Sequence, residues 1–156
     1  MPKGEDAGPL DGFDRKLLAE LSVNGRLPIT ELARRIGLSK SPTQARLKRL
    51  EASGHILGYR AQLDPVKLGR EHVAFLEVRL TDTREPALSA FNAAVIKIPE
   101  IEQCHLIAGQ FDYLMKIRCK DMRAYREILA DVVSTLPYVA STSTHVSMQA
   151  VKDSAL

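Results

Sequence analysis

The stretch RRIGLSKSPTQARLKRL, residues 34–50, decides the fold of the N-terminal part of the chain. Its apolar residues recur at helical spacing on both sides of Gly37, and it carries six basic side chains and no acidic one. The whole chain of 156 residues has a formal net charge of only +3. Residues 1–64 hold that entire excess, because acidic and basic side chains are equal in number over residues 65–156. Positive charge concentrated in this way predicts contact with a polyanion.

Two helices are predicted before the third: one precedes this stretch, and the other overlaps its first residues. The first is predicted over residues 14–23, with Asp11 or Asp14 as its N-cap. The second is predicted over residues 29–36, where apolar side chains form a buried stripe. Gly37 ends the second helix and is predicted to take the left-handed conformation that a sharp turn needs.

The third helix follows at once, with Ser39 or Ser41 as its N-cap and Pro42 in the first turn, where proline is tolerated. Successive residues are about 100° apart around a helix, so Thr43, Leu47 and Leu50 form an apolar face and the opposite face is polar and basic. Arg and Lys donate to guanine edges, and Gln pairs with adenine. Two helices joined by a glycine turn, the second with such a face, are typical of the helix-turn-helix that enters the DNA major groove. The predicted DNA-binding residues are Lys40, Ser41, Thr43, Gln44, Arg46, Lys48 and Arg49.

Arg46 lies at the edge of the apolar face, so its partner is either a DNA phosphate or an acid of the first helix such as Asp14. The alternative for the whole helix is a solvated charged face; the glycine turn and the absence of acids favour DNA.

After the third helix, Gly54 is predicted as the C-cap. Two short strands around Gly58 are predicted to form the wing that braces such a domain, and His55 is predicted on its surface.

The C-terminal half changes to the alternating pattern of a half-buried strand. The predicted elements are a strand over residues 73–80, a helix over 86–98, strands over 101–108 and 113–119, a helix over 121–136 and a strand over 141–151. This order predicts an α+β fold, with a four-stranded antiparallel sheet and both helices on one face. Val73 and Phe75 point to the other face, so burial against a second copy of the chain predicts a homodimer.

Membrane proteins, secreted proteins and enzymes are disfavoured by features that the sequence lacks. No apolar run approaches the roughly 18 residues of a membrane span, and the first residues do not resemble a signal peptide, so we expect the cytoplasm. The two cysteines are expected to be reduced thiols there. The histidines lack metal-ligand spacing, and Cys104 and His105 point to opposite faces of a strand. We therefore predict no enzyme activity, no metal site and no cofactor.

The segments LDGFDRKLLAEL (residues 10–21), RLPITELARRIGLSKSPTQARLKRLEASGHILGYRAQLDP (residues 26–65) and AGQFDYLMKIR (residues 108–118) resemble the leucine-responsive regulatory protein/asparagine regulator (Lrp/AsnC) family of transcription factors. The resemblance runs from Leu10 to Val151. It implies a winged helix-turn-helix DNA-binding domain over residues 10–60, after a flexible tail at 1–9. It further implies a linker strand over 61–71 and, over 72–156, a ferredoxin-like domain that binds an amino acid, dimerises and assembles to octamers.

The resemblance also implies where an amino-acid effector binds. Members of the family hold it at the loop of the AGxxDY motif, with help from the last strand. The chemistry fits, because an amino acid needs an acid or carbonyl for its ammonium group and hydroxyl or N–H donors for its carboxylate. The alternative is that these residues only make a turn and an exposed strand. The predicted effector-binding residues are Ala108, Gly109, Asp112, Tyr113, Ser141, Thr142, Ser143 and Thr144.

Within the family, residues 69–109 and 136–151 are similar to the proline-responsive activators of proline dehydrogenase genes in alphaproteobacteria. This similarity implies a nucleoid-associated activator of proline catabolism that responds to proline. The alternative inside the family is a regulator that responds to leucine or another branched-chain amino acid. The alternative outside it is a metabolic module that binds small molecules and not DNA.

Overall fold

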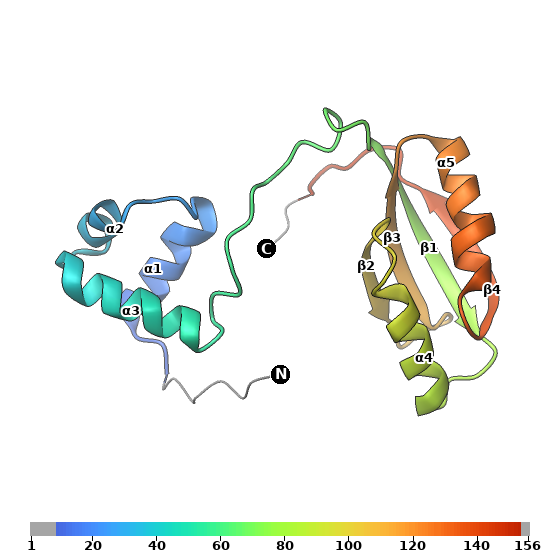
Figure 1. Cartoon of the computed structure of the whole chain (residues 1–156), viewed down its shortest axis with the longest axis horizontal. Coiled ribbons are helices and arrows are strands. Elements are labelled where there is room, and N and C mark those ends of the chain that lie inside the picture. Colours follow the sequence, from blue (N-terminus) through green and yellow to red (C-terminus); the bar gives the residue numbers. More distant parts are fainter. Residues whose placement is uncertain (1–8, 154–156) are drawn as a thin grey trace. The chain divides into compact units, whose positions relative to one another are not determined.

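The structure is a computed structural model that describes residues 9–153. The chain divides into two compact units, one ending at Gln62 and the other beginning at Leu63 (Figure 1). The tail predicted at residues 1–9 lies outside the described residues, apart from Pro9. None of the helices within residues 9–153 has the length and apolar character needed to cross a membrane.

Three helices form the N-terminal unit: α1 (Gly12–Val23), α2 (Ile29–Ile36) and α3 (Lys40–Ala52). Their apolar faces meet in a small core built on Leu17, Ile36 and Leu50. The first helix starts two residues earlier than predicted, because Asp11 is the cap and Asp14 completes a capping box with it. The Asp14 N–H donates to Asp11 at 2.9 Å, and the Asp11 N–H donates to Asp14 at 3.1 Å.

The turns around α3 use glycine where the backbone is left-handed. Gly37, with φ of 79°, lies between α2 and α3 as predicted. Ser39 is the residue that precedes α3, and its side chain makes no capping hydrogen bond. Ser53 is the C-cap of α3, and Gly54, predicted for that place, follows it with φ of 74°.

The predicted wing and linker strand are wrong, because no strand is present between the end of α3 and His72. An extended segment becomes a strand only when a second strand satisfies its N–H and C=O groups. Within residues 9–153 the segment finds no such partner, and Leu57 and Leu63 are 96% and 66% exposed. Tyr59 instead holds the segment to the helices, since its hydroxyl donates to Glu51 at 2.9 Å.

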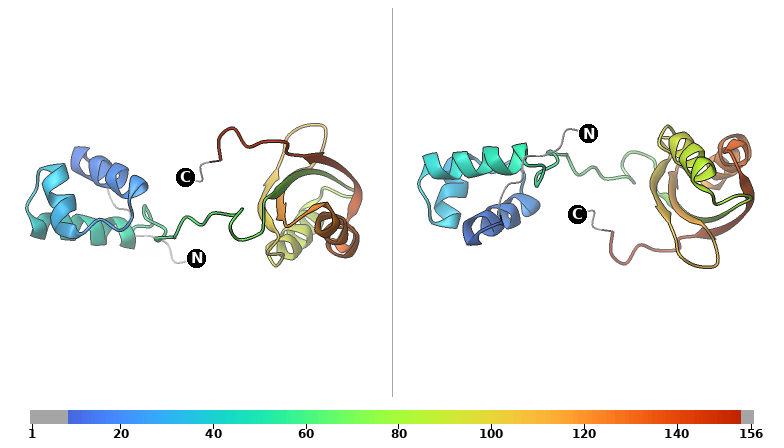
Figure 2. Two further views of the ribbon diagram at one scale, coloured as in Figure 1. Left: turned by 90° about the horizontal axis from the view of Figure 1, so that it is seen from above. Right: turned by 90° about the horizontal axis from the view of Figure 1, so that it is seen from below.

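The C-terminal unit has the predicted strand–helix–strand–strand–helix–strand order. Its elements are β1 (His72–Leu80), α4 (Glu85–Val95), β2 (Ile101–Leu106), β3 (Tyr113–Cys119), α5 (Met122–Glu127) and β4 (Val139–Val146). The strands lie in the order β2-β3-β1-β4, and every neighbouring pair is antiparallel. Both helices cover the same face of this sheet, as Figure 2 shows from two sides. The α+β, ferredoxin-like prediction is therefore confirmed.

The core of this unit lies between the sheet and the two helices. Leu76, Val78 and Phe91 are fully buried there, and the Phe91 and Tyr113 ring centroids are 4.4 Å apart. The strand β4 ends at Val146, five residues before the predicted end at Val151.

The helix predicted over residues 121–136 is not a regular α-helix throughout. Tyr125, Val133 and Leu136 are buried, whereas Val132 is only partly buried and Met122 is 41% exposed. A π-helical turn over Ile128–Val132 follows α5 and adds about one residue to the turn. That extra residue moves every later side chain around the helix axis.

The sheet face that carries no helix is here called the open face. The register pairs Phe75 with Lys116 and Val73 with Arg118, so these four side chains share it. Val73 and Phe75 were predicted on this face, and the pairing confirms them. The two basic residues were not expected there, yet they are only 9% and 8% exposed.

Candidate DNA interface and effector site

Four of the six basic side chains in residues 34–50 are held by acids from outside that stretch. Arg34 lies 2.7 Å from Glu31, and Arg35 bridges Glu31 at 2.7 Å and Glu20 of α1 at 2.8 Å. Hydrogen bonds from the two arginines lower the pKa of Glu31 to about 2. Arg35 therefore joins α2 to α1, whereas Arg34 is paired within α2, and both are less available to DNA than the sequence suggested.

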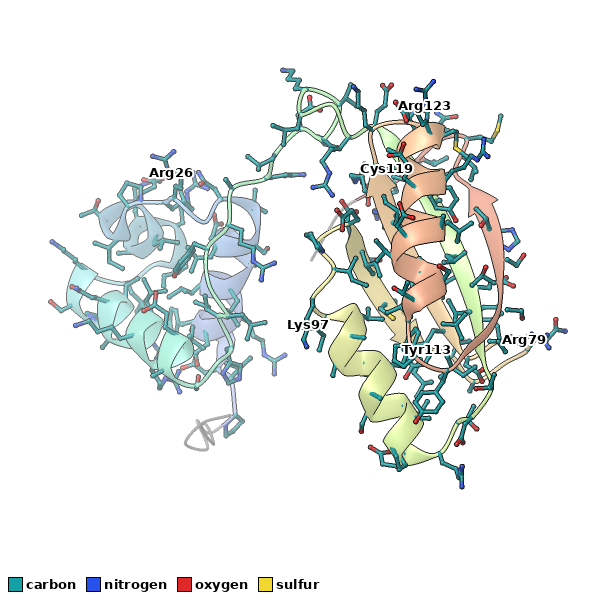
Figure 3. The ribbon with its side chains drawn as sticks, turned by 45° about the vertical axis from the view of Figure 1, so that its right-hand side comes forward. Arg26, Arg79, Lys97, Tyr113, Cys119 and Arg123 are labelled. Carbon is teal, nitrogen blue, oxygen red and sulfur yellow. The ribbon has the colours of Figure 1, made fainter. Side chains whose placement is uncertain are left out.

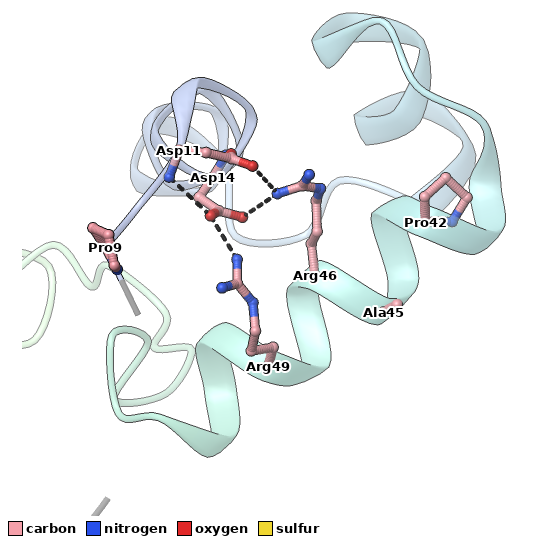
Figure 4. A pocket seen from close by; sticks show the side chains of 7 residues that line it. All are labelled: Pro9, Asp11, Asp14, Pro42, Ala45, Arg46 and Arg49. Carbon is pink, nitrogen blue, oxygen red and sulfur yellow. Dashed lines mark hydrogen bonds and ion pairs between the residues drawn. The ribbon is translucent and has the colours of Figure 1, made fainter. Parts of the chain in front are cut away.

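Arg46 and Arg49 reach from α3 to the capping box of α1 (Figure 4). Arg46 donates to Asp11 at 2.6 Å and to Asp14 at 2.9 Å, and Arg49 donates to Asp14 at 2.5 Å. Arg46 also lies over the ring of Phe13, 5.5 Å from its centroid. Of the two partners considered for Arg46, the structure gives it the acids of α1.

Asp14 is the centre of this cluster and is 1% exposed. Burial by itself raises the pKa of Asp14, but hydrogen bonds from Arg49 and Arg46 outweigh burial and lower the pKa to about 2. A buried carboxylate with two arginine partners fixes α3 against α1. The cluster borders a hollow of about 440 Å³ whose lining residues are Pro9, Asp11, Asp14, Pro42, Ala45, Arg46 and Arg49.

Thr43 does not belong to the outward face of α3. Its side chain is fully buried and its hydroxyl donates to the Ser39 carbonyl at 2.9 Å. Its inclusion among the DNA-binding residues is a prediction that the structure contradicts, because a residue on the apolar face points into the core.

The face of α3 that remains open to a partner is narrower than predicted. Lys40, Ser41, Gln44 and Lys48 are exposed, and neither lysine forms an ion pair within residues 9–153. Arg49 is also on the surface, with 41% of its side chain exposed, but Asp14 holds its guanidinium group. Two free lysines flanked by Ser and Gln form a surface suited to phosphates and base edges in a major groove.

The predicted effector loop is tied to the end of β1 through Asp112. The Leu80 N–H donates to Asp112 Oδ2 at 2.7 Å, and the Asp112 N–H donates to the Val78 carbonyl at 2.9 Å. Asp112 Oδ1 accepts no hydrogen bond from any residue in the range 9–153. One carboxylate oxygen thus fixes the loop, and the other has no hydrogen-bond partner within residues 9–153. Ala108 and Gly109 are exposed in the same loop.

Tyr113 has a different place from the one predicted. It is 2% exposed at the start of β3, and its hydroxyl donates to Asn92 at 2.8 Å (Figure 3). Because the ring packs in the core and the hydroxyl has a partner, Tyr113 supports the loop from beneath and does not present a group to an effector.

The four hydroxyl residues of β4 do not form one surface. The register pairs Ser141 with Arg79 and Ser143 with Glu77 on the open face, whereas Thr142 and Thr144 lie on the helix side. The Thr144 hydroxyl is 2.7 Å from that of Tyr125. Successive residues of a strand point to opposite faces, which the prediction of a shared site overlooked. Ser141 and Thr142 lie nearest the end of β1 that holds Asp112.

The histidines and cysteines are placed as follows. Residues 9–153 contain no group of three His, Cys, Asp or Glu side chains placed to hold a metal ion. Cys104 pairs with Met115 and His105 with Leu114, so they lie on opposite faces of β2 as predicted. Burial raises the pKa of the Cys104 thiol to about 11, and both cysteines are free.

One cluster was missed by sequence reasoning: Lys116 and Arg118 on the open face, with Glu102 and Asp153 as their partners. The signal was present in the strand KIRC, where two basic residues alternate with core residues. Basic side chains at alternate positions of a central strand share one face.

Comparison with known proteins agrees with both units. Residues 10–51 match the AsnC-type helix-turn-helix domain, and residues 73–156 match the Lrp/AsnC ligand binding domain. The chain is 53% identical to a proline dehydrogenase transcriptional activator of Rhizobium radiobacter over 100% of both chains. It is 54% identical to one of Rhodobacter capsulatus over 91% of this chain and 92% of the relative.

A solved structure gives the same result for the fold. The crystal structure of a transcriptional regulator of Neisseria meningitidis in complex with L-Met has a TM-score of 0.87 and 33% sequence identity to this chain. The match covers 93% of this chain and 94% of that one. The chain therefore belongs to the Lrp/AsnC family, as a DNA-binding transcriptional regulator with an amino-acid ligand-binding domain.

Proposed function

We propose that this regulator responds to proline and activates transcription of a proline dehydrogenase gene in the cytoplasm. The observation that carries the proposal is the 53% identity to a proline dehydrogenase transcriptional activator over the full length of both chains. DNA is read by Lys40, Ser41, Gln44 and Lys48 on α3, the residues whose side chains are exposed and not held by Asp14. The chain has no catalytic role in this scheme.

The effector binds at the edge where the loop after β2 meets the ends of β1 and β4. Asp112 Oδ1 accepts from the ammonium group, and the hydroxyl groups of Ser141 or Thr142 donate to the carboxylate. Support comes from the free oxygen of Asp112 and from the register that brings the start of β4 to the end of β1.

Two copies pack through their open faces, and dimers assemble further toward an octamer. By linkage, DNA and amino acid alter each other's affinity by the same factor.

A thermal-shift screen of the full chain against the twenty amino acids tests the effector. A ligand at about 100 times its Kd adds about 2.7 kcal/mol to the stability of the form that binds it. We expect an upward shift with proline and none with leucine. A shift with leucine or another branched-chain amino acid and none with proline would contradict the proline assignment and keep the family.

Asp112→Asn separates the two roles of this carboxylate. Asparagine keeps an acceptor for the Leu80 N–H and removes the negative charge that an ammonium group needs. We expect a melting temperature close to that of the parent chain, retained DNA binding and loss of the shift with proline. The matched control is Glu127→Gln, which removes an exposed charge on α5 that forms no ion pair within residues 9–153. An undiminished proline shift in Asp112→Asn would exclude Asp112 from the site.

The competing class, a metabolic module that does not act on DNA, predicts a different salt dependence. For a reader of DNA, log affinity falls with log salt concentration with a slope of about −0.9 for each phosphate contact. A weak affinity that does not change with salt would favour the competitor. A protein that wraps DNA without regard to sequence shares the slope but shows little preference among promoters.

A further inference from the structure

Two nearly buried cations on the open face require an explanation. Lys116 and Arg118 lie on β3, which is hydrogen-bonded on both sides, to β1 and to β2. Their side chains are each 10% exposed. Lysine and arginine are almost never this buried unless they are paired. Because β3 is fixed from both sides, neither residue can turn away from the open face.

Their partners come from opposite directions along the chain. A register irregularity in β2 between Ile101 and Gln103 accompanies the placement of Glu102 beside β3, where it lies 2.6 Å from Arg118 and 3.6 Å from Lys116. Asp153, beyond the end of β4, lies 2.9 Å from each cation through a different carboxylate oxygen. The four side chains form a cluster with two positive and two negative charges.

Asp153 is the point at which the C-terminal segment is held to the sheet. The segment leaves β4 at Ser147, whose N–H donates to the Val73 carbonyl at 2.9 Å. Between these two ends, Met148 and Val151 are 98% and 93% exposed, so the segment has little apolar contact of its own. Hydrogen bonding from Lys116 is the main cause that lowers the pKa of Asp153 below its ordinary value.

The net charge of the cluster affects whether the open face can pack against the open face of a second copy of the chain. Two-fold symmetry places the same patch of both copies in one interface, so a net charge on the patch lies opposite the same charge on the second copy and the two repel each other. The other charged residues on the sheet strands of this face, Glu77 and Arg79, cancel each other. The charges of the cluster and of these strand residues sum to zero, and without Asp153 each copy contributes one uncompensated cation. Covering an unpaired buried cation is costly.

We propose that Asp153 is the counter-charge that lets a second copy of this chain cover the open face, so that the C-terminal segment sets the strength of self-association. This inference rests on the dimer given under Proposed function. Asp153 acts through Lys116 and Arg118, and its charge, not its shape, is what the interface requires. The C-terminal segment is thereby part of the dimer interface and does not compete with it.

Sedimentation equilibrium of the full chain over a range of concentrations tests this inference. Asp153→Asn keeps the size of the side chain and removes its charge, and we expect a dimer dissociation constant about tenfold higher. The matched control is Asp131→Asn, which changes the net charge equally at an exposed residue without an ion pair in residues 9–153. It should leave association unchanged.

A second variant separates loss of charge balance from loss of shape. Lys116→Met combined with Asp153→Asn removes one cation together with one anion, so the cluster is again neutral and association should return close to that of the parent chain. Unchanged or tighter association of Asp153→Asn would overturn the inference, the tighter result because it would make the segment a competitor of the second copy. A parent chain that stays monomeric at every concentration would overturn the dimer itself and this inference with it.

Discussion

Replacing Asp14 by asparagine lowers the stability of the N-terminal unit by about 3 kcal/mol at neutral pH, because the buried side chain loses its charge and Arg49 is left without an acidic partner within residues 9–153. Asp14 is 1% exposed and accepts from both Arg46 and Arg49. Hydrogen exchange of the amides of α1, α2 and α3 in the full chain measures this loss for that unit separately. The amides of the C-terminal sheet serve as the internal reference.

Asp11→Asn is the control for this variant. Asp11 also bonds Arg46, but 47% of its side chain is exposed, and exposed pairs contribute about 0–1 kcal/mol. Asparagine keeps the acceptor for the Asp14 N–H, so the helix cap remains. Equal effects of Asp11→Asn and Asp14→Asn would contradict the view that the buried carboxylate joins α3 to α1.

The same carboxylate makes the N-terminal unit sensitive to acid. The pKa of Asp14 falls from 3.8 to about 2 on folding, and at about 1.36 kcal/mol for each pKa unit this difference stabilises the folded state by about 2 kcal/mol. Since the folded-state pKa is the lower one, the stabilisation is complete well above pH 3.8 and is lost as the pH falls through about 2. Asp14→Asn should lack this loss over the same range.

Lys48→Ala should weaken DNA binding about tenfold while leaving the fold intact, since a good base contact contributes about 1–3 kcal/mol. If Lys48 contacts a phosphate instead, the slope of log affinity against log salt falls by about 0.9. Lys48 is exposed on α3 and forms no ion pair within residues 9–153. Fluorescence anisotropy with a labelled promoter fragment at several salt concentrations distinguishes the two cases.

Two further variants serve as a control and a comparison for this measurement. Lys97→Ala removes the same charge from an exposed site in the C-terminal unit and should not change DNA affinity. Arg49→Ala should lower the stability of the N-terminal unit, because Asp14 loses a partner. Unchanged promoter binding in Lys48→Ala would contradict the assignment of α3 as the reading helix.

The sequence predicted the elements of the fold well because their hydrophobic periods were unambiguous. The alternation around Leu76 and Val78 and the left-handed Gly37 each depend on residues close together in the chain. The wing was predicted incorrectly, since a strand needs a partner and Leu57 to Leu63 finds none within residues 9–153. The π-helical turn after Glu127 could not be predicted either, because a hydrophobic pattern with a fixed period does not indicate where the helical period changes.

The site was harder to predict because its members pair with distant residues. A helical wheel placed Arg49 on the reading face, and nothing near it in sequence indicated that Asp14, 35 residues away, would hold it. Thr43 is buried, as its place on the apolar face of the third helix indicates, so its assignment to DNA binding is wrong. Asp153 pairs with β3 from a segment with no pattern of its own.

The most direct test of the central claim is a DNA titration with the full chain, with and without proline. The two fragments are a proline dehydrogenase promoter and a scrambled sequence of equal length and composition. We expect tighter binding to the promoter, an affinity for it that changes with proline, and no such change with leucine. Equal affinity for both fragments, or a promoter affinity that proline leaves unaltered, would contradict a proline-responsive reader of DNA sequence.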